Sequence, residues 1–250
     1  MKTVTGSTAS EKKMIKAIQT AIGAIADGQI GTQTMSDIAR LVKADCFPLT
    51  LQIYSQPVII AKDFVPYASQ GATITKYTNA ISGSFLSGKD PCSVMIRDGE
   101  VISPNACHYW QTYPESVLYK LKDGSYGIKR VRTASELPKG VVAAVGGMGL
   151  LGNYSPSDEG FKRMICNGKS LDFSDVLRKT NHTMLGVKSG YIYLCYCKNM
   201  TGAQVNDYAK KLGLEMAIML DGGHVAAING EESFAKINTK QKQYYIVKGE

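Results

Sequence analysis

The chain has 250 residues, of which 44% are hydrophobic and 20% charged, a composition typical of a folded globular protein and not of a disordered one. Lysine and arginine outnumber aspartate and glutamate by 29 to 21, and the net charge of +8 favours anionic ligands such as phosphates. The basic residues are scattered and do not alternate with aromatic side chains, which argues against nucleic-acid binding. The sequence shows no signal peptide and no segment of membrane-spanning length, so we expect a soluble, cytoplasmic protein.

Residues 10–44 carry the helical pattern, with apolar residues three and four positions apart on either side of a turn at 27–31. The turn reads D-G-x-x-G-x-x-T from Asp27 to Thr34 and follows a helix that contains Gln19. This arrangement resembles the peptidoglycan-binding-like helical module, and the resemblance implies binding to cell-wall glycan. The alternative is a helical hairpin that only packs on the main domain. We therefore divide the chain into a helical segment, 1–46, and a main domain, 47–250.

After Pro48 the hydrophobic period changes from that of a helix to that of a strand. One long helix is predicted, with Thr201 and Gln204 as its capping box and Gly213 as its C-cap. Many short strands and few helices predict an α+β fold with a mixed, mainly antiparallel sheet. The predicted strands are 49–54, 57–60, 73–77, 93–96, 101–103, 116–120, 126–130, 141–145, 184–187, 191–197, 216–220 and 225–229.

The six cysteines show neither the spacing of a zinc site nor a C-x-x-C pair. Cys195 and Cys197 stand two positions apart in an apolar strand, so both thiols are expected on one face. Because the chain shows no export signal, we expect reduced thiols that pack as small hydrophobic groups.

The segment from Asp221 to His224 follows the predicted buried strand 216–220. Gly222 and Gly223 let the chain turn sharply and let a ligand approach the backbone amides. A carboxylate at the end of a buried strand is rigidly held, as acid, base or metal chemistry requires. Asp221 is therefore the first candidate for a catalytic residue, although Asp-Gly turns are common without any function.

Five pieces of sequence surround this candidate in a characteristic order: 80–85, 94–103, 182–187, the helix ending at Gly213, and 220–223. Their order and spacing, over about residues 70–230, resemble the phosphodiester glycosidase family. That family includes the lysosomal enzyme that removes N-acetylglucosamine from a phosphate-linked mannose. The resemblance implies hydrolysis of a sugar-1-phosphodiester, with release of the sugar and a phosphomonoester.

The chain departs from the family pattern at polar positions near the expected site. Ser82 stands where the family has Asn, Ser84 where it has Gly, and His182 where it has Arg. His224 and Val225 replace a Gly and a Ser after the Asp-Gly-Gly turn. These departures leave the expected fold unchanged and bear on the substrate and on turnover.

The chemistry implied by the resemblance needs groups that stabilise an oxocarbenium-like centre and a departing phosphate. We assign Asp221 as nucleophile or electrostatic partner and His224 as general acid, since imidazole titrates near neutral pH. His182 and Thr183 would hold phosphate oxygens by their side chains, and Gly222 and Gly223 by their amides. The remaining expected site residues are Ser82, Gly83, Gly147, in an expected turn at 146–149, and Asn153.

The expected ligand is a phosphorylated carbohydrate or a nucleotide-like small molecule, and no cofactor is expected. The residues leave a divalent cation at Asp221 open, with no second carboxylate at ligand spacing. Two other functions remain as alternatives. The first is a binding protein that sequesters a phosphorylated sugar or nucleotide-derived ligand without hydrolysis. The second is a phage or bacterial hydrolase of cell-wall glycan, virion-associated or released to the wall and targeted by residues 10–44.

Overall fold

The computed structural model describes residues 47–87, 90–91, 93–104, 114–151, 164–166, 169–171 and 179–250, together with isolated positions before residue 47. The chain forms two compact units, Met1–Phe47 and Pro48–Glu250. In the first unit, β1 (Val4–Thr5) pairs with β2 (Gln29–Ile30). Gln29 and Ile30 were predicted to lie in a turn, and that prediction is wrong because they form a strand with residues far away in sequence. The two helices predicted over 10–44 lie largely outside the described residues.

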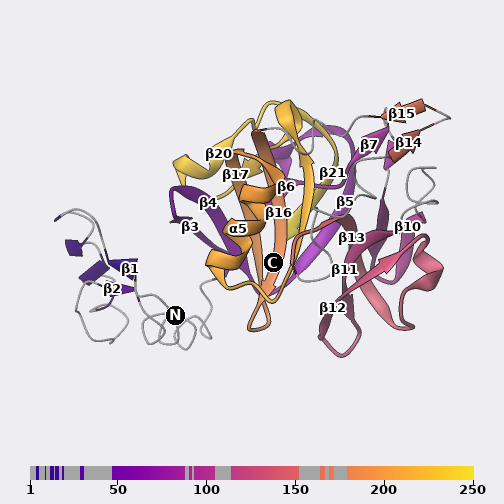
Figure 1. Cartoon of the computed structure of the whole chain (residues 1–250), viewed down its shortest axis with the longest axis horizontal. Coiled ribbons are helices and arrows are strands. Elements are labelled where there is room, and N and C mark those ends of the chain that lie inside the picture. Colours follow the sequence, from indigo (N-terminus) through magenta and orange to yellow (C-terminus); the bar gives the residue numbers. More distant parts are fainter. Residues whose placement is uncertain are drawn as a thin grey trace. The chain divides into compact units, whose positions relative to one another are not determined.

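The second unit is built on a ten-stranded antiparallel sheet (Figure 1). Eight strands follow the order β10-β9-β13-β18-β16-β17-β4-β3, while β11 pairs with β13 and with β12. The strands are β3 (Leu49–Ile53), β4 (Gln56–Ala61), β9 (Val94–Arg97), β10 (Glu100–Pro104), β11 (Glu115–Leu121), β12 (Tyr126–Val131), β13 (Val141–Gly149), β16 (Thr180–Lys188), β17 (Tyr191–Met200) and β18 (Met216–Gly222).

A second sheet of five antiparallel strands has the order β20-β19-β6-β21-β5. Its strands are β5 (Phe64–Thr73), β6 (Ala80–Ser82), β19 (Ile228–Asn229), β20 (Lys236–Ile237) and β21 (Lys242–Gly249). Two short hairpins complete the described strands: β7 (Leu86–Ser87) with β8 (Asp90–Pro91), and β14 (Met164–Cys166) with β15 (Lys169–Leu171). The described part of the unit is thus the mainly antiparallel α+β fold that the sequence predicts.

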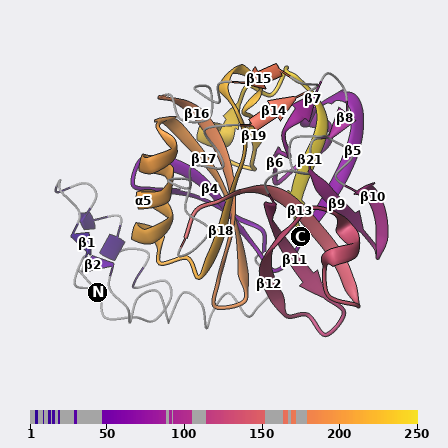
Figure 2. The same cartoon turned by 45° about the vertical axis from the view of Figure 1, so that its right-hand side comes forward.

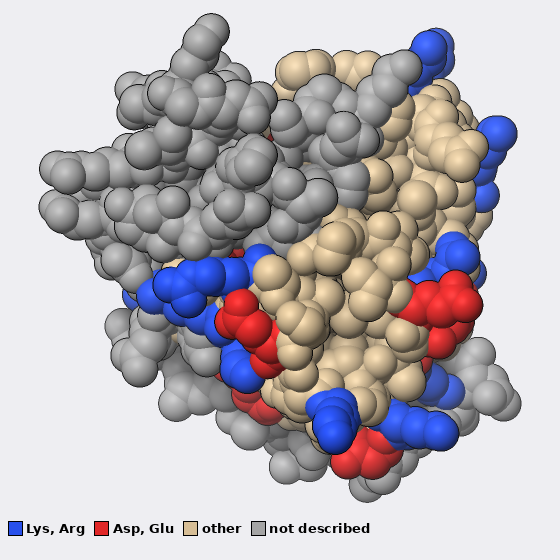
Figure 3. All heavy atoms as spheres, turned by 90° about the vertical axis from the view of Figure 1, so that its right-hand side faces the viewer, with Lys and Arg blue, Asp and Glu red and all other residues tan. Residues whose placement is uncertain are grey.

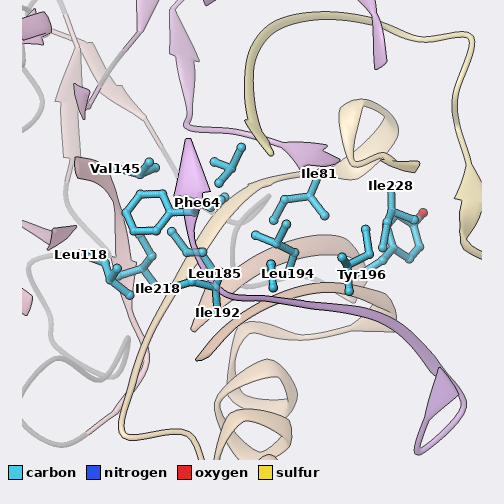
Figure 4. Close-up of a cluster of buried hydrophobic side chains, with 14 of the residues drawn as sticks. Phe64, Ile81, Leu118, Val145, Leu185, Ile192, Leu194, Tyr196, Ile218 and Ile228 are labelled. Carbon is cyan, nitrogen blue, oxygen red and sulfur yellow. The ribbon is translucent and has the colours of Figure 1, made fainter. Parts of the chain in front are cut away.

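The main hydrophobic core joins the two sheets (Figure 4). Leu185 and Ile218 come from the large sheet, whereas Phe64, Ile81 and Ile228 come from the small one, and all five are almost completely buried. Burying such side chains is the main favourable contribution to folding. The core therefore holds the ends of β6 and β18, where the candidate site lies, in a fixed arrangement.

The predicted helix is α5 (Gly202–Leu212), which packs on β16, β17 and β18 (Figure 2). Thr201 and Gln204 form the reciprocal capping box, and Gly213 ends the helix in the left-handed conformation, with φ of 69°. Val205 and Tyr208 are buried on its inner side. The prediction for this element is confirmed because its start, apolar face and stop are all encoded locally.

Several predicted strand boundaries are wrong. Residues 73–77 contain a 3-10 turn, η1 (Ile74–Lys76), where a strand was predicted. Within the predicted strand 225–229, only the two residues of β19 form a strand. They follow another 3-10 turn, η5 (Gly223–Val225). Residues 146–149 form the end of β13 and not a turn. Three of these four residues are glycines, and a strand position without a side chain lets a neighbouring strand approach closely.

Basic and acidic side chains lie close together around an uncharged area on the face shown in Figure 3. The described part of this face therefore carries mixed charge and no continuous basic surface. Within the described residues, no helix is long and apolar enough to cross a membrane.

Candidate active site

β18 ends at Gly222, one residue after Asp221. The pairing of β18 with β16 is irregular between Met219 and Gly222, where three steps along β18 match two along β16. Asp221 donates its backbone N–H to the carbonyl of Gly83, 3.1 Å away, just after β6. The backbone of Asp221 is therefore tied to the small sheet as well as to the large one, and its side chain is firmly placed.

Asp221 is partly buried. Its Oδ1 accepts a 2.8 Å hydrogen bond from the N–H of Gly222, and none of the ion pairs among the described residues involves it. Burial raises the pKa of Asp221 to about 7, while the Gly222 hydrogen bond opposes that rise. A carboxyl group that titrates near neutral pH suits proton transfer in either direction.

Two buried hydroxyl groups, those of Ser82 and Thr183, join the strands beneath Asp221. Thr183 Oγ1 lies 3.0 Å from the carbonyl of Ser82 and 3.1 Å from that of Asp221, and donates to them. Ser82 Oγ accepts from the N–H of Ala227 at 3.0 Å. Both hydroxyls are thus engaged within the protein. They hold the site together, whereas the sequence suggested that they face a ligand.

Close backbone contacts explain two of the glycines. A Cβ at Gly83 would lie 2.9 Å from the backbone carbon of Tyr245, and Gly83 also donates its N–H to the Tyr245 carbonyl at 2.9 Å. A Cβ at Gly222 would lie 2.8 Å from the carbonyl oxygen of Asn181 and from Nδ1 of His182. Neither position has room for a side chain.

The two histidines of the predicted site have different environments. His182 is buried, and its Nε2 lies 2.9 Å from the carbonyl oxygen of Met200. His182 therefore packs beneath Gly222, and only a rearrangement would let it reach a ligand. His224 is exposed in η5, and its carbonyl accepts from Gln241 Nε2 at 3.3 Å. Of the two, His224 has the accessible imidazole that a general acid needs.

The two remaining predicted site residues are Gly147 and Asn153. Gly147 lies in β13, where a Cβ would approach the Met219 carbonyl oxygen to 2.5 Å. Its neighbour Gly146 accepts a 2.7 Å hydrogen bond from the hydroxyl of Ser84, one residue beyond Gly83. The structure thus brings Gly147 to the end of β18, as the sequence led us to expect. Asn153 lies outside the described residues.

Glu115, the first residue of β11, is a buried carboxyl group near this site that the sequence did not reveal. Burial raises its pKa to about 8, while the N–H of Val94 and the Ser93 hydroxyl act in the opposite direction. The only local signal is a glutamate that opens the apolar run from Ser116 to Leu118, a pattern equally common at exposed strand ends. Within the described residues, no group of three potential ligands from His, Cys, Asp and Glu is placed to hold a metal ion.

Comparison with known proteins gives a family and a fold. The family model for phosphodiester glycosidases matches residues 71–244, which is more than half of the chain. No curated protein sequence matches the chain at a significant level.

The solved structures that are similar to this chain have very different sequences. The zebrafish N-acetylglucosamine-1-phosphodiester α-N-acetylglucosaminidase catalytic domain, auto-inhibited by its pro-peptide, is 14% identical with a TM-score of 0.52, and 82% of each chain is covered. A hypothetical protein from Synechocystis is 10% identical with a TM-score of 0.45, covering 80% of this chain and 60% of its own. A putative exported protein from Burkholderia pseudomallei is 9% identical with a TM-score of 0.42, covering 78% of this chain and 74% of its own.

The family match spans β6, the Gly146–Gly147 strand, the His182–Thr183 strand and the Asp221 turn, which are the elements that meet at the candidate site. The chain therefore belongs to the phosphodiester glycosidase family.

Proposed function

We propose that this protein hydrolyses a sugar-1-phosphodiester and releases the sugar and a phosphomonoester. Family membership supports the reaction class. Asp221 is the observation that carries the assignment to a site. Its backbone N–H donates to the carbonyl of Gly83, its carboxyl group accepts from the N–H of Gly222, and burial raises its pKa to about 7.

In this reaction the bond between the anomeric carbon and the phosphate oxygen breaks through an oxocarbenium-like transition state. Asp221 in its ionised form stabilises the positive charge that develops at that carbon, either as nucleophile or electrostatically. The exposed His224 is our candidate for the acid that protonates the departing phosphate. Water supplies the new oxygen on the sugar.

The contacts refine the roles of the neighbouring residues. The Gly222 amide already binds Asp221 Oδ1, so we assign it to holding the carboxylate and leave the Gly223 amide for a phosphate oxygen. Ser82 and Thr183 position the backbone under Asp221. His182 supports Gly222 by packing against it.

The direct test is hydrolysis of a sugar-1-phosphodiester in ¹⁸O-labelled water. The proposal predicts that the label enters the sugar, because the carbon–oxygen bond breaks. Label in the phosphomonoester would mean attack at phosphorus and would contradict the assignment. Unlabelled buffer with the same enzyme serves as the control.

One observation favours a second candidate, a binding protein that uses the same site without turnover. Ser82 and His182 stand at positions where the sequence departs from the family pattern, and both are engaged in contacts within the protein. A sugar phosphate or nucleotide-like ligand that raises the melting temperature while no phosphodiester is cleaved would support this candidate. Cleavage at a catalytic rate would exclude it.

A further inference from the structure

Glu115 is a buried carboxyl group with an unused oxygen. Its Oε1 accepts a 2.7 Å hydrogen bond from the N–H of Val94, whereas Oε2 has no hydrogen-bond partner among the described residues. The side chain is fully buried, and the Ser93 hydroxyl beside it favours the ionised form of Glu115 but makes no hydrogen bond of regular geometry within the described part of the chain. Such groups are rare in folded proteins and call for a physical reason.

The carboxyl group of Glu115 lies directly against the backbone of Gly146. A Cβ built at Gly146 would be 2.3 Å from Oε2, so the carboxyl occupies the space that any side chain there would need. On its other side, Gly146 accepts the 2.7 Å hydrogen bond from Ser84 through its carbonyl oxygen. Glu115 and Ser84 therefore fix the same peptide of β13.

This peptide lies where the neighbour of β13 changes. Val145 pairs with Met95 of β9, whereas Met148 pairs with Met219 of β18. Between these two pairs, the carbonyl of Gly146 accepts a hydrogen bond from the segment that carries Ser84. That segment continues to Gly83, whose carbonyl accepts the N–H of Asp221 at 3.1 Å. A continuous set of contacts thus runs from Glu115 through Gly146, Ser84 and Gly83 to Asp221.

We propose that Glu115 is a positioning residue for Asp221. The neutral carboxyl group of Glu115 fixes Gly146 and, through Ser84 and Gly83, the end of β18. The proposal rests on the proposed function of Asp221. A neutral carboxyl is tolerated in this enclosed space, whereas a carboxylate with an unpaired oxygen strongly favours water. Ionisation of Glu115 therefore loosens its contact with Gly146 and displaces Asp221.

The surroundings of Glu115 supply little to offset that cost. Burial is the main influence on its pKa, which lies at about 8. The charged or titratable side chains on the strands packed around it are Arg97 of β9, Tyr126, Lys129 and Arg130 of β12, and Asp221 of β18. Arg130 pairs with Ser116 and Lys129 with Val117 in the strand register, so neither stands directly opposite Glu115.

The test compares Glu115→Gln with Glu100→Gln, an exposed glutamate on β10, by kcat/KM for a sugar-1-phosphodiester from pH 6 to pH 10. For the wild type and Glu100→Gln we expect activity to fall above about pH 8, because Glu115 ionises there. Glu115→Gln should keep activity at pH 7 within about fivefold of the wild type and show a smaller alkaline fall, with only the part due to the acid that protonates the departing phosphate remaining. An unchanged alkaline fall, or a folded variant that is inactive at every pH, would overturn the proposal.

Two further measurements keep the proposal falsifiable if that variant does not fold or the substrate is not cleaved. Ser84→Ala interrupts the set of contacts, and it should lower kcat with little change in KM; wild-type kcat would contradict the proposal. The carboxyl ¹³C resonance of Glu115 reports its ionisation without any turnover. A midpoint near 8 supports a neutral Glu115 even if the proposed reaction fails, whereas a midpoint below about 6 refutes it.

Discussion

Burial raises the pKa of two carboxyl groups, that of the partly buried Asp221 to about 7 and that of the fully buried Glu115 to about 8. In the unfolded chain both ionise near their ordinary values of 3.8 and 4.5. At pH values between the pKa of the unfolded chain and that of the folded protein, each group keeps a proton in the folded protein that it has released in the unfolded chain. Stability is therefore greatest below the unfolded pKa and falls as the pH rises through the folded value.

Replacing Glu115 by Gln should flatten this dependence. One pH unit corresponds to about 1.4 kcal/mol per group, so Glu115 accounts for a loss of about 4 kcal/mol between pH 5 and pH 8. Urea unfolding of the wild type and Glu115→Gln at these two pH values measures the difference. Glu100→Gln is the matched control and should retain the wild-type slope, because Glu100 is exposed. Parallel curves for wild type and Glu115→Gln would show that Glu115 is ionised in the folded state.

At this scale the sequence placed Asp221 at the end of a buried strand but did not reveal the contacts around it. Asp221 and Gly222 still belong to β18, and the chain turns from Gly223 onward. The turn is encoded by adjacent residues, whereas the buried state of Glu115 depends on Gly146, which is brought close only by strand pairing. The same reason explains Ser82 and Thr183. The sequence resemblance places both residues near Asp221. It does not predict the hydrogen bonds that their side chains make with the protein backbone.

Elements with local signals were predicted best. The helix α5 has its capping box, its apolar face and its terminal glycine within one stretch of sequence. By contrast, β5 and β21 were not predicted, although they pair along most of their length. Their pairing is interrupted by a register shift beside Gln70 and Gly71, which have φ of 52° and 82°, and Pro66 lies within β5. These features hide a strand from any pattern based on simple alternation.

The capping box at Thr201 gives a prediction for α5. Thr201→Ala removes the side-chain acceptor of the Gln204 N–H and should lower the free energy of unfolding by about 1 kcal/mol. Thr201→Ser keeps the hydroxyl and should stay close to the wild type. Equal losses in both variants by urea unfolding would mean that the threonine methyl group, and not the hydrogen bond, stabilises the helix.

At the scale of the whole molecule, the chain consists of two compact units, Met1–Phe47 and Pro48–Glu250. The second has its own two-sheet core and contains every residue that we assign to the reaction. The fold class of this unit could be predicted because short strands with one capped helix are readily recognised. The order of the strands could not, since it depends on pairings between distant residues such as β13 with β18.

We propose that the segment 1–46 binds cell-wall glycan and that the second unit works without it. A variant lacking residues 1–46 should keep the thermal stability of the main unit and its hydrolysis of the phosphodiester, but no longer sediment with purified peptidoglycan. The full chain is the control. Sedimentation that is unchanged by the deletion, or absent in the full chain, would refute the proposed role of the segment.

The central claim is that Asp221 carries out the reaction, and Asp221→Asn tests it most directly. Asparagine can still accept the Gly222 hydrogen bond through its side-chain oxygen, so the fold should be preserved and the melting temperature nearly unchanged. It cannot supply a negative charge, and we expect kcat/KM for a sugar-1-phosphodiester to fall at least about a thousandfold. Wild-type activity in a correctly folded Asp221→Asn protein would contradict the account.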